Sequence, residues 1–173
     1  STLTLKEKTI VSSANLNAIS LVGTSSLVTS STGDANEISR TKDGSGDTGY
    51  TILAADTAAL NIGTTTIKSY GGGILLSGAN TLKIDNSSIA GTTTKEDSLL
   101  VLKGTSKVTS MTKTAIKNGL YGIHLTGAAT ITSMESSSIS NNTNGIYVVG
   151  STTADAPTTI SSVKTTTFTG NTY

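Results

Sequence analysis

The sequence predicts an all-β fold: a single-stranded parallel β-helix (β-solenoid) of about six to seven coils. One observation is a short apolar pattern that returns every 20 to 30 residues, roughly the length of one coil. The other is composition: the 173 residues include 25 Ser, 34 Thr, 18 Gly and 11 Asn, with one Pro and no Trp. Such a chain is too β-branched for disorder and too poor in helix formers for a helical domain. We expect residues 1–173 to form one β-helix domain.

The first recurring pattern is L-x-I-x4-I, which stands at Leu60, Ile62 and Ile67 and again at Leu82, Ile84 and Ile89. Leu3, Leu5 and Ile10 fit the same spacing, and looser copies end at Ile116, Ile139 and Phe168. From Ile67 onward, the last members of the copies are separated by 22, 27, 23 and 29 residues. The pattern therefore predicts one coil for each copy, with insertions in the longer ones.

A second pattern places an apolar residue four positions before a glycine. It occurs at Ile19–Gly23, Ile74–Gly78, Leu100–Gly104, Ile123–Gly127 and Ile146–Gly150. Apolar residues alternate with other residues around these positions, which is typical of strands too short to form a sheet alone. Stacked coils solve this problem, because each strand pairs with its counterpart about 4.8 Å along the axis.

Other repetitive β-folds fit less well. A leucine-rich repeat needs the L-x-x-L-x-L-x-x-N frame, which we do not find. A propeller or sandwich should show hairpin turns and more aromatic residues, so these folds remain the alternatives.

Polar residues follow the last apolar member of each copy and predict a corner. Asn118, Asn142 (or its neighbour Asn141) and Asn171 are predicted to stack there as a ladder, since Asn tolerates left-handed backbone and its amide bonds adjacent turns. Glycines at 73, 122 and 145 are expected to let the chain enter the next strand closely.

Charge and cysteine content exclude several classes of function. The chain carries 12 basic and 11 acidic residues, a net charge of +1, and no basic run, so we expect no nucleic-acid partner. Without Cys it has neither disulfides nor a Cys-ligated zinc site. No apolar run reaches the roughly 18 residues that span a bilayer, so we expect no direct membrane insertion of this segment. We also expect no cofactor.

The titratable residues do not predict an enzyme. Asp56, Asp85, Asp97 and Asp155 fall in different phases of the repeat, whereas an acid-base pair should occupy matching positions of adjacent coils. His124, between Ile123 and Leu125, is expected to point outward as a solvated side chain. A carbohydrate-active β-helix enzyme is therefore only an alternative.

The longest polar segment, residues 31–50, is predicted to be a loop insertion. Within it, Asp43, Ser45 and Asp47 alternate with small or polar residues, resembling the opening of a calcium loop. The glycine and glutamate expected later in such a loop are missing, so calcium at Asp43 and Asp47 is a weak possibility beside a solvated loop. Loops that project from a rigid scaffold commonly bind partners, so we consider these residues a candidate binding loop.

Hydroxyl-bearing residues suggest two further surface roles. The positions one and three before each repeat's last apolar member are often Thr or Ser, as at Thr64 and Thr66, which is typical of ice-binding solenoids. Lys113 interrupts this array. The same polar faces instead allow self-association with a second copy of the rod.

Short motifs resemble a known family. GGGI at 71–74, ISNN at 139–142 and FTGN at 168–171 resemble the GGA-I and F-x-x-N repeats of chlamydial polymorphic outer-membrane proteins. More broadly, the Thr-, Ser-, Asn- and Gly-rich, Cys-free chain is similar to the passenger domains of bacterial type V autotransporter adhesins.

This resemblance implies a right-handed β-helix, displayed at the bacterial outer membrane or secreted, in a protein of cell adhesion and virulence. It implies attachment to a host-cell receptor or glycan, or self-association, with a passive structural stalk as the alternative. Because the chain opens at Ser1 without Met and ends at Tyr173 within a motif, we expect a fragment excised from a longer passenger.

Overall fold

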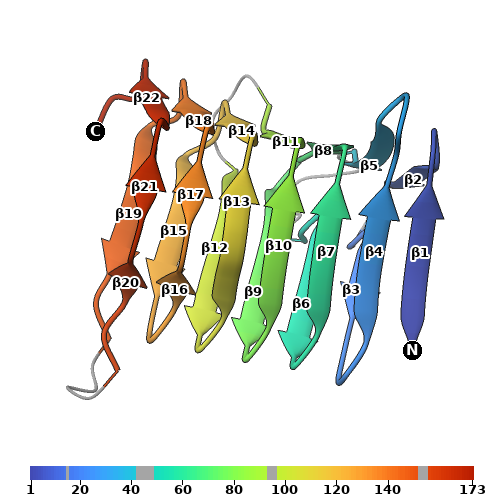
Figure 1. Cartoon of the computed structure of the whole chain (residues 1–173), viewed down its shortest axis with the longest axis horizontal. Helices are drawn as coiled ribbons and strands as arrows, with labels where there is room; N and C mark the ends of the chain where they lie inside the picture. Colours follow the sequence, from blue (N-terminus) through green and yellow to red (C-terminus); the bar gives the residue numbers. More distant parts are fainter. Residues whose placement is uncertain (15, 42–48, 93–96, 152–155) are drawn as a thin grey trace.

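Parallel strands wind into a three-sided solenoid in the computed structural model, which describes residues 1–14, 16–41, 49–92, 97–151 and 156–173 (Figure 1). The chain passes through one strand of each sheet in turn and then returns one level further along the axis. The N-terminus lies at one end of the stack and the C-terminus at the other (Figure 1).

The first sheet has nine strands in the order β1-β4-β7-β10-β13-β16-β20, with β17 and β21 attached beside this path. The strands are β1 (Thr2–Lys6), β4 (Ser26–Ser30), β7 (Ala59–Gly63), β10 (Thr81–Asp85), β13 (Lys107–Thr112), β16 (Thr130–Ile131), β17 (Met134–Glu135), β20 (Thr159–Ile160) and β21 (Val163–Lys164).

The second sheet has seven strands: β2 (Ile10–Ser13), β5 (Asn36–Arg40), β8 (Thr65–Lys68), β11 (Ser88–Ala90), β14 (Ala115–Lys117), β18 (Ser138–Ser140) and β22 (Thr167–Thr169). The third sheet has six: β3 (Ile19–Leu21), β6 (Ile52–Asp56), β9 (Gly72–Gly78), β12 (Ser98–Gly104), β15 (Tyr121–Thr126) and β19 (Asn144–Val149). Because the third sheet has six strands and the second has seven, the described chain makes six complete turns and begins a seventh.

The register confirms the predicted β-solenoid and most of its repeat. Ile67, Ile89, Ile116, Ile139 and Phe168 lie opposite one another on successive strands of the second sheet. The apolar residues of the glycine pattern form another continuous file through the third sheet: Ile19, Ile52, Ile74, Leu100, Ile123 and Ile146. The last member of the first pattern and the apolar member of the second pattern thus each form one inward file of the solenoid.

Two predictions at the N-terminal end are wrong. Ile10 is not the inward member of the first coil: Val11 pairs with Ile38 of the inward file, whereas Ile10 pairs with Glu37 and is 70% exposed. The corner between Leu5 and Val11 is one residue longer than the corresponding corner between Ile62 and Ile67, and a shift of one residue turns a strand's side chains to the opposite face.

The predicted loop at 31–50 is also wrong for part of its length, because Asn36–Arg40 form β5. This coil escaped detection because buried Thr29 stands where other coils carry an apolar residue. Its hydroxyl lies 2.7 Å from that of Thr65 and donates to the Gly63 carbonyl at 3.1 Å. A hydroxyl is therefore accommodated in the interior without losing its hydrogen bonds.

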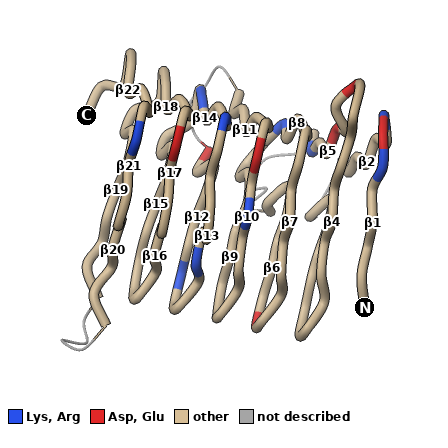
Figure 2. The backbone as a smooth tube through the Cα atoms, in the orientation of Figure 1, with Lys and Arg blue, Asp and Glu red and all other residues tan. Residues whose placement is uncertain are grey.

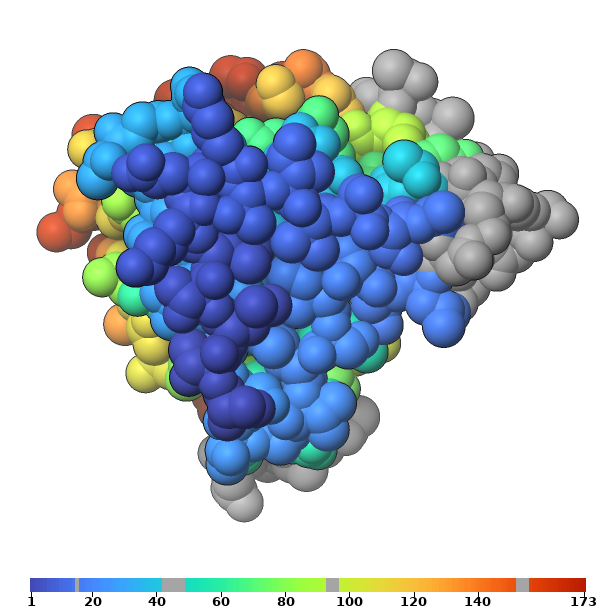
Figure 3. Space-filling view, turned by 90° about the vertical axis from the view of Figure 1, so that its right-hand side faces the viewer, coloured from blue at the N-terminus to red at the C-terminus, as the bar shows by residue number. Residues whose placement is uncertain are grey.

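The interior is a continuous stack of aliphatic side chains. Ile67, Ile89 and Ile116 are completely buried, and each such side chain contributes about 1.5–3 kcal/mol of hydrophobic stabilisation before entropy costs. The last turn is more open, since Val163 and Phe168 are each 46% exposed. At the other end, the first coil lies across the end of the stack, seen along the axis in Figure 3.

Close approach of the coils explains the glycines at 73 and 122. A Cβ on Gly73 would overlap the carbonyl oxygen of Leu99, and one on Gly122 would lie 2.6 Å from the carbonyl oxygen of Gly145. Both glycines are buried at the start of strands of the third sheet. They allow the corner of one coil to lie directly against the next.

The described residues contain strands and turns but no helix. Among them there is consequently no helix with the length and apolar character needed to cross a membrane.

Candidate functional site

The predicted binding loop cannot be placed. Asp43, Ser45 and Asp47 lie outside the described residues, so the calcium possibility at Asp43 and Asp47 stays a prediction. Among the described residues, no group of three or more His, Cys, Asp or Glu side chains is arranged to hold a metal ion.

The corner between the second and third sheets contains two of the three predicted ladder residues in direct contact. The Asn142 amide nitrogen Nδ2 donates to Asn171 Oδ1 at 3.1 Å, and the Asn142 backbone N–H donates to the same oxygen. Asn142 is fully buried, and its Oδ1 accepts the backbone N–H of Gly119 at 2.8 Å. These side chains replace water as hydrogen-bond partners of the corner backbone.

Asn118 lies one residue before the position in this corner that the predicted ladder requires. Its neighbour Lys117 is level with Ser140 on β18, so Asn118 stands beside Asn141 and not beside Asn142. Both Asn118 and Asn141 have left-handed backbone, with φ of 67° and 56°. Asn118 therefore supplies the turn conformation that asparagine tolerates, while Gly119 occupies the ladder position.

A second polar ladder, at the corner between the first and second sheets, was missed from the sequence. Its members are buried or half-buried and each donates its hydroxyl to the carbonyl two residues earlier: Thr65, Ser87, Thr114, Ser137 and Thr166. All stand two residues before the inward apolar residue of the coil. This constant spacing before the last apolar member of each repeat is the signal in the sequence that indicates such a ladder.

The outer face of the third sheet carries a cluster of three rings, here called the aromatic cluster: Tyr121 and His124 on β15 and Tyr147 on β19. The two tyrosine rings stack with centroids 4.6 Å apart and planes 20° from parallel. The His124 imidazole lies 5.1 Å from each tyrosine ring centroid. These separations are those of favourable aromatic contacts, which hold the rings in fixed positions.

Strand alternation and register bring these rings together. His124 and Tyr147 are directly opposite each other on adjacent strands, and both point away from the core because the buried Ile123 and the inward-facing Ile146 precede them. His124 is thus half-buried among tyrosines rather than simply solvated as predicted. Tyr147 is 40% exposed, so the cluster is accessible from outside.

Apolar residues continue this file along the sheet. Moving toward the N-terminus, the positions level with His124 are Val101, Leu75 and Leu53. Leu53 and Leu75 are half-buried on the outer face, where strands of a solvated sheet more often carry polar residues. Val101, between Leu75 and His124, is only 1% exposed, so a buried position separates the apolar surface at Leu53 and Leu75 from the aromatic cluster.

The charge near this cluster is positive. Lys103 of β12 is exposed and forms no ion pair among the described residues. Partial burial and the nearby Lys103 ammonium lower the pKa of His124 below its ordinary value. In the strands of the third sheet the single carboxylate is Asp56, the last residue of β6, which is level with Gly104 two strands away. Its Oδ2 accepts the Gly23 backbone N–H at 3.0 Å. Figure 2 shows how sparse the charges are along the strands.

The first sheet has a different feature, a shallow depression of about 320 Å³ on its outer face. Lys83 and Asn61 line it together with aliphatic and hydroxyl-bearing residues, but no described carboxylate does. A lyase or hydrolase site needs a matched acid-base pair. The depression offers one cation and no such pair.

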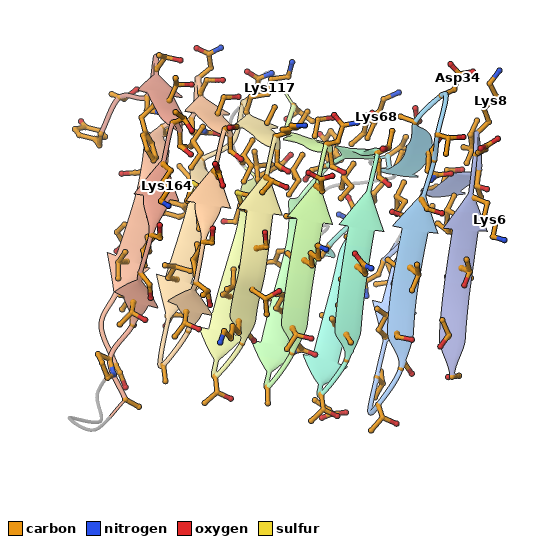
Figure 4. All side chains as sticks on the ribbon, in the orientation of Figure 1. Lys6, Lys8, Asp34, Lys68, Lys117 and Lys164 are labelled. Atoms are coloured by element: carbon orange, nitrogen blue, oxygen red, sulfur yellow. The ribbon has the colours of Figure 1, made fainter. Side chains whose placement is uncertain are left out.

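The outer face of the second sheet carries Thr66, Ser88, Ala115, Ser138 and Thr167 in one file. Lys113 does not interrupt this file, because it lies at the preceding corner with φ of 45°. The lysines beside the file are Lys68, which pairs with Glu37 at 2.6 Å, and Lys117; Figure 4 shows both on this side of the solenoid. Ice binding and self-association through this face stay hypotheses.

Comparison with known proteins identifies the architecture. A family model described as "Right handed beta helix region" matches residues 1–172. No curated protein and no solved structure matches the chain. The match confirms the expected right-handed β-helix, while the narrower resemblance to autotransporter passengers stays a hypothesis.

Proposed function

This chain belongs to the right-handed β-helix family, and from that premise we propose that it is an adhesin-like rod that attaches to a partner through the aromatic cluster of its third sheet. Its activity is binding and not catalysis. The partner is a receptor or glycan on a host cell, and the rod is displayed on a bacterial surface or secreted.

The observation that supports attachment is the gathering of rings on one outer face. The chain has only five Tyr, one Phe and one His, yet three of these seven ring side chains form the aromatic cluster. Exposed tyrosines supply a large contact area at low entropy cost, and they are common in binding surfaces. A stalk that only holds another domain needs no such cluster.

The test is adhesion of beads coated with the chain to epithelial cells. Replacing Tyr147 by Ser removes the most exposed ring of the cluster, and we expect adhesion to fall about tenfold, as for a central tyrosine of an interface. Tyr173→Ser is the matched control, because Tyr173 is 84% exposed and takes no part in the ring contacts of the cluster. Equal adhesion of both variants and the parent chain would contradict the proposal.

Two further measurements distinguish binding through the aromatic cluster from the alternative functions. Replacing residues 42–48 by a short Gly-Ser link tests the predicted binding loop, and adhesion lost only in this variant would move the contact away from the third sheet. Clumping of beads without adhesion to cells would indicate self-association. Failure of the parent chain in both assays would favour a passive stalk.

A further inference from the structure

We infer that the aromatic cluster, together with Lys103, is a binding site for an anionic sugar, a pyranose ring that carries a carboxylate or sulfate group. This inference rests on the proposed attachment through the third sheet and names the chemistry of the ligand at that site.

The shape of the surface favours a sugar over a peptide. The site lies on the outer face of the regular strands β15 and β19, and the depression on the first sheet is not part of it. A peptide anchors its side chains in pockets or pairs its backbone with an exposed strand edge. β19 is the last strand of the third sheet, but the stacked rings lie on the outer face of the sheet and not along the free edge of β19. A pyranose instead presents a flat face of C–H bonds that packs on aromatic rings.

The neighbouring side chains suit the rest of a sugar. Half-buried Thr126 follows His124 two residues later on the same outer face, and half-buried Ser77 lies level with Lys103 on the adjacent strand β9. Their hydroxyls both donate and accept hydrogen bonds, as the hydroxyl groups of a sugar require. Rings for the C–H face and hydroxyls for the edges thus occur within four consecutive strands of the third sheet, with Thr126 on the same strand as His124 and Ser77 two strands away on β9.

The charge distribution favours a negatively charged ligand. Lys103 is exposed and without an ion pair in the described part of the molecule, and an unpaired ammonium attracts an anion. The groups facing His124 are Tyr121 on its own strand, Tyr147 on β19 and Lys103 on β12. None of them is a carboxylate.

The same geometry makes binding sensitive to pH. Partial burial and Lys103 lower the pKa of His124, so the neutral imidazole is favoured more than in an ordinary histidine, and an anion bound beside it favours the protonated form. By linkage, the ligand then binds more tightly as the pH falls and His124 takes up a proton. His124→Gln is expected to remove this rise in affinity.

The experiment measures binding of the purified chain to four probes by titration calorimetry at low salt. The probes are a heparin oligosaccharide, a hyaluronan oligosaccharide, neutral dextran and poly-glutamate. We expect binding to one or both acidic sugars and none to dextran, and the two acidic probes separate sulfate from carboxylate recognition. Lys103→Gln should weaken binding about three- to tenfold, and Tyr147→Ser about tenfold or more.

Lys117→Gln provides the matched control, because Lys117 is an exposed lysine on the second sheet. Equal losses in Lys103→Gln and Lys117→Gln would reveal unspecific charge attraction and overturn the inference. Equal binding of dextran would overturn the anionic requirement, and binding of poly-glutamate as tight as that of the sugars would indicate an acidic peptide ligand. If adhesion depends on Tyr147 but no sugar binds, the inference fails while the proposed attachment stands.

Discussion

Asn142 allows a sharp test of what holds the coils together. In the Asn142→Ala variant, the buried N–H of Gly119 loses the acceptor that lies 2.8 Å away in the parent chain. A buried donor left without a partner costs about 1–3 kcal/mol. The donations from Nδ2 to Asn171 at 3.1 Å and to the Ile116 carbonyl at 3.4 Å are also lost, each worth about 0.5–1.5 kcal/mol at most.

We therefore expect Asn142→Ala to lower the free energy of unfolding by about 2–4 kcal/mol. Asn118→Gly is the matched control. Its φ of 67° suits glycine at least as well, and the described hydrogen bonds of Asn118 come from its backbone, so we expect a change below about 1 kcal/mol.

Urea unfolding followed by circular dichroism gives the two free energies, and amide hydrogen exchange reports locally on the Gly119 N–H. Exchange at Gly119 should accelerate in Asn142→Ala and stay unchanged in Asn118→Gly. Our reasoning would be refuted by a loss below about 1 kcal/mol in Asn142→Ala, or by equal losses in the two variants, since neither outcome fits a buried ladder of hydrogen bonds.

Three further substitutions test the packing and the surface by the same unfolding assay. Gly73→Ala should destabilise the chain by about 1–3 kcal/mol, because the new methyl group overlaps the backbone oxygen of Leu99; an unchanged midpoint would contradict this close approach. Ile116→Ala removes a fully buried side chain from a central coil and should cost about 2–5 kcal/mol, and a cost below that range would indicate a looser core. Lys68→Ala removes an exposed ion pair with Glu37 and should change the unfolding free energy by less than about 1 kcal/mol; a larger loss would show that this pair is more than a surface contact.

The errors in the predicted repeat have a local cause. The inward files could be read wherever the corners keep a constant length, as between Ile67 and Ile89. They were misread at Ile10, where the corner gains a residue, and at Thr29, where a hydroxyl enters the core. A pattern of apolar residues contains no information on corner length, and it cannot anticipate a buried hydroxyl whose partners come from another coil.

The candidate site shows the same limit. Alternation correctly directed His124 outward, but Tyr121 and Tyr147 were not recognised as its neighbours. Tyr121 and His124 lie on β15, and Tyr147 lies on β19. His124 and Tyr147 are 23 residues apart in the sequence, and only the register between the two strands places them side by side. Asn142 and Asn171 were predicted as neighbours because both occur at the same offset in their repeats.

The sequence by itself thus determined the solenoid, its inward files, its close glycine contacts and the absence of cysteine chemistry, because these follow from periodicity and composition within single coils. The tertiary structure alone decided the exposed ring cluster and the position of Lys103 near it. The physical reason is that stacking fixes which residues of different coils share a level. A contact between coils depends on the number of residues in every corner that separates them. Which corner lengths are favourable depends on how well the side chains of the assembled core pack.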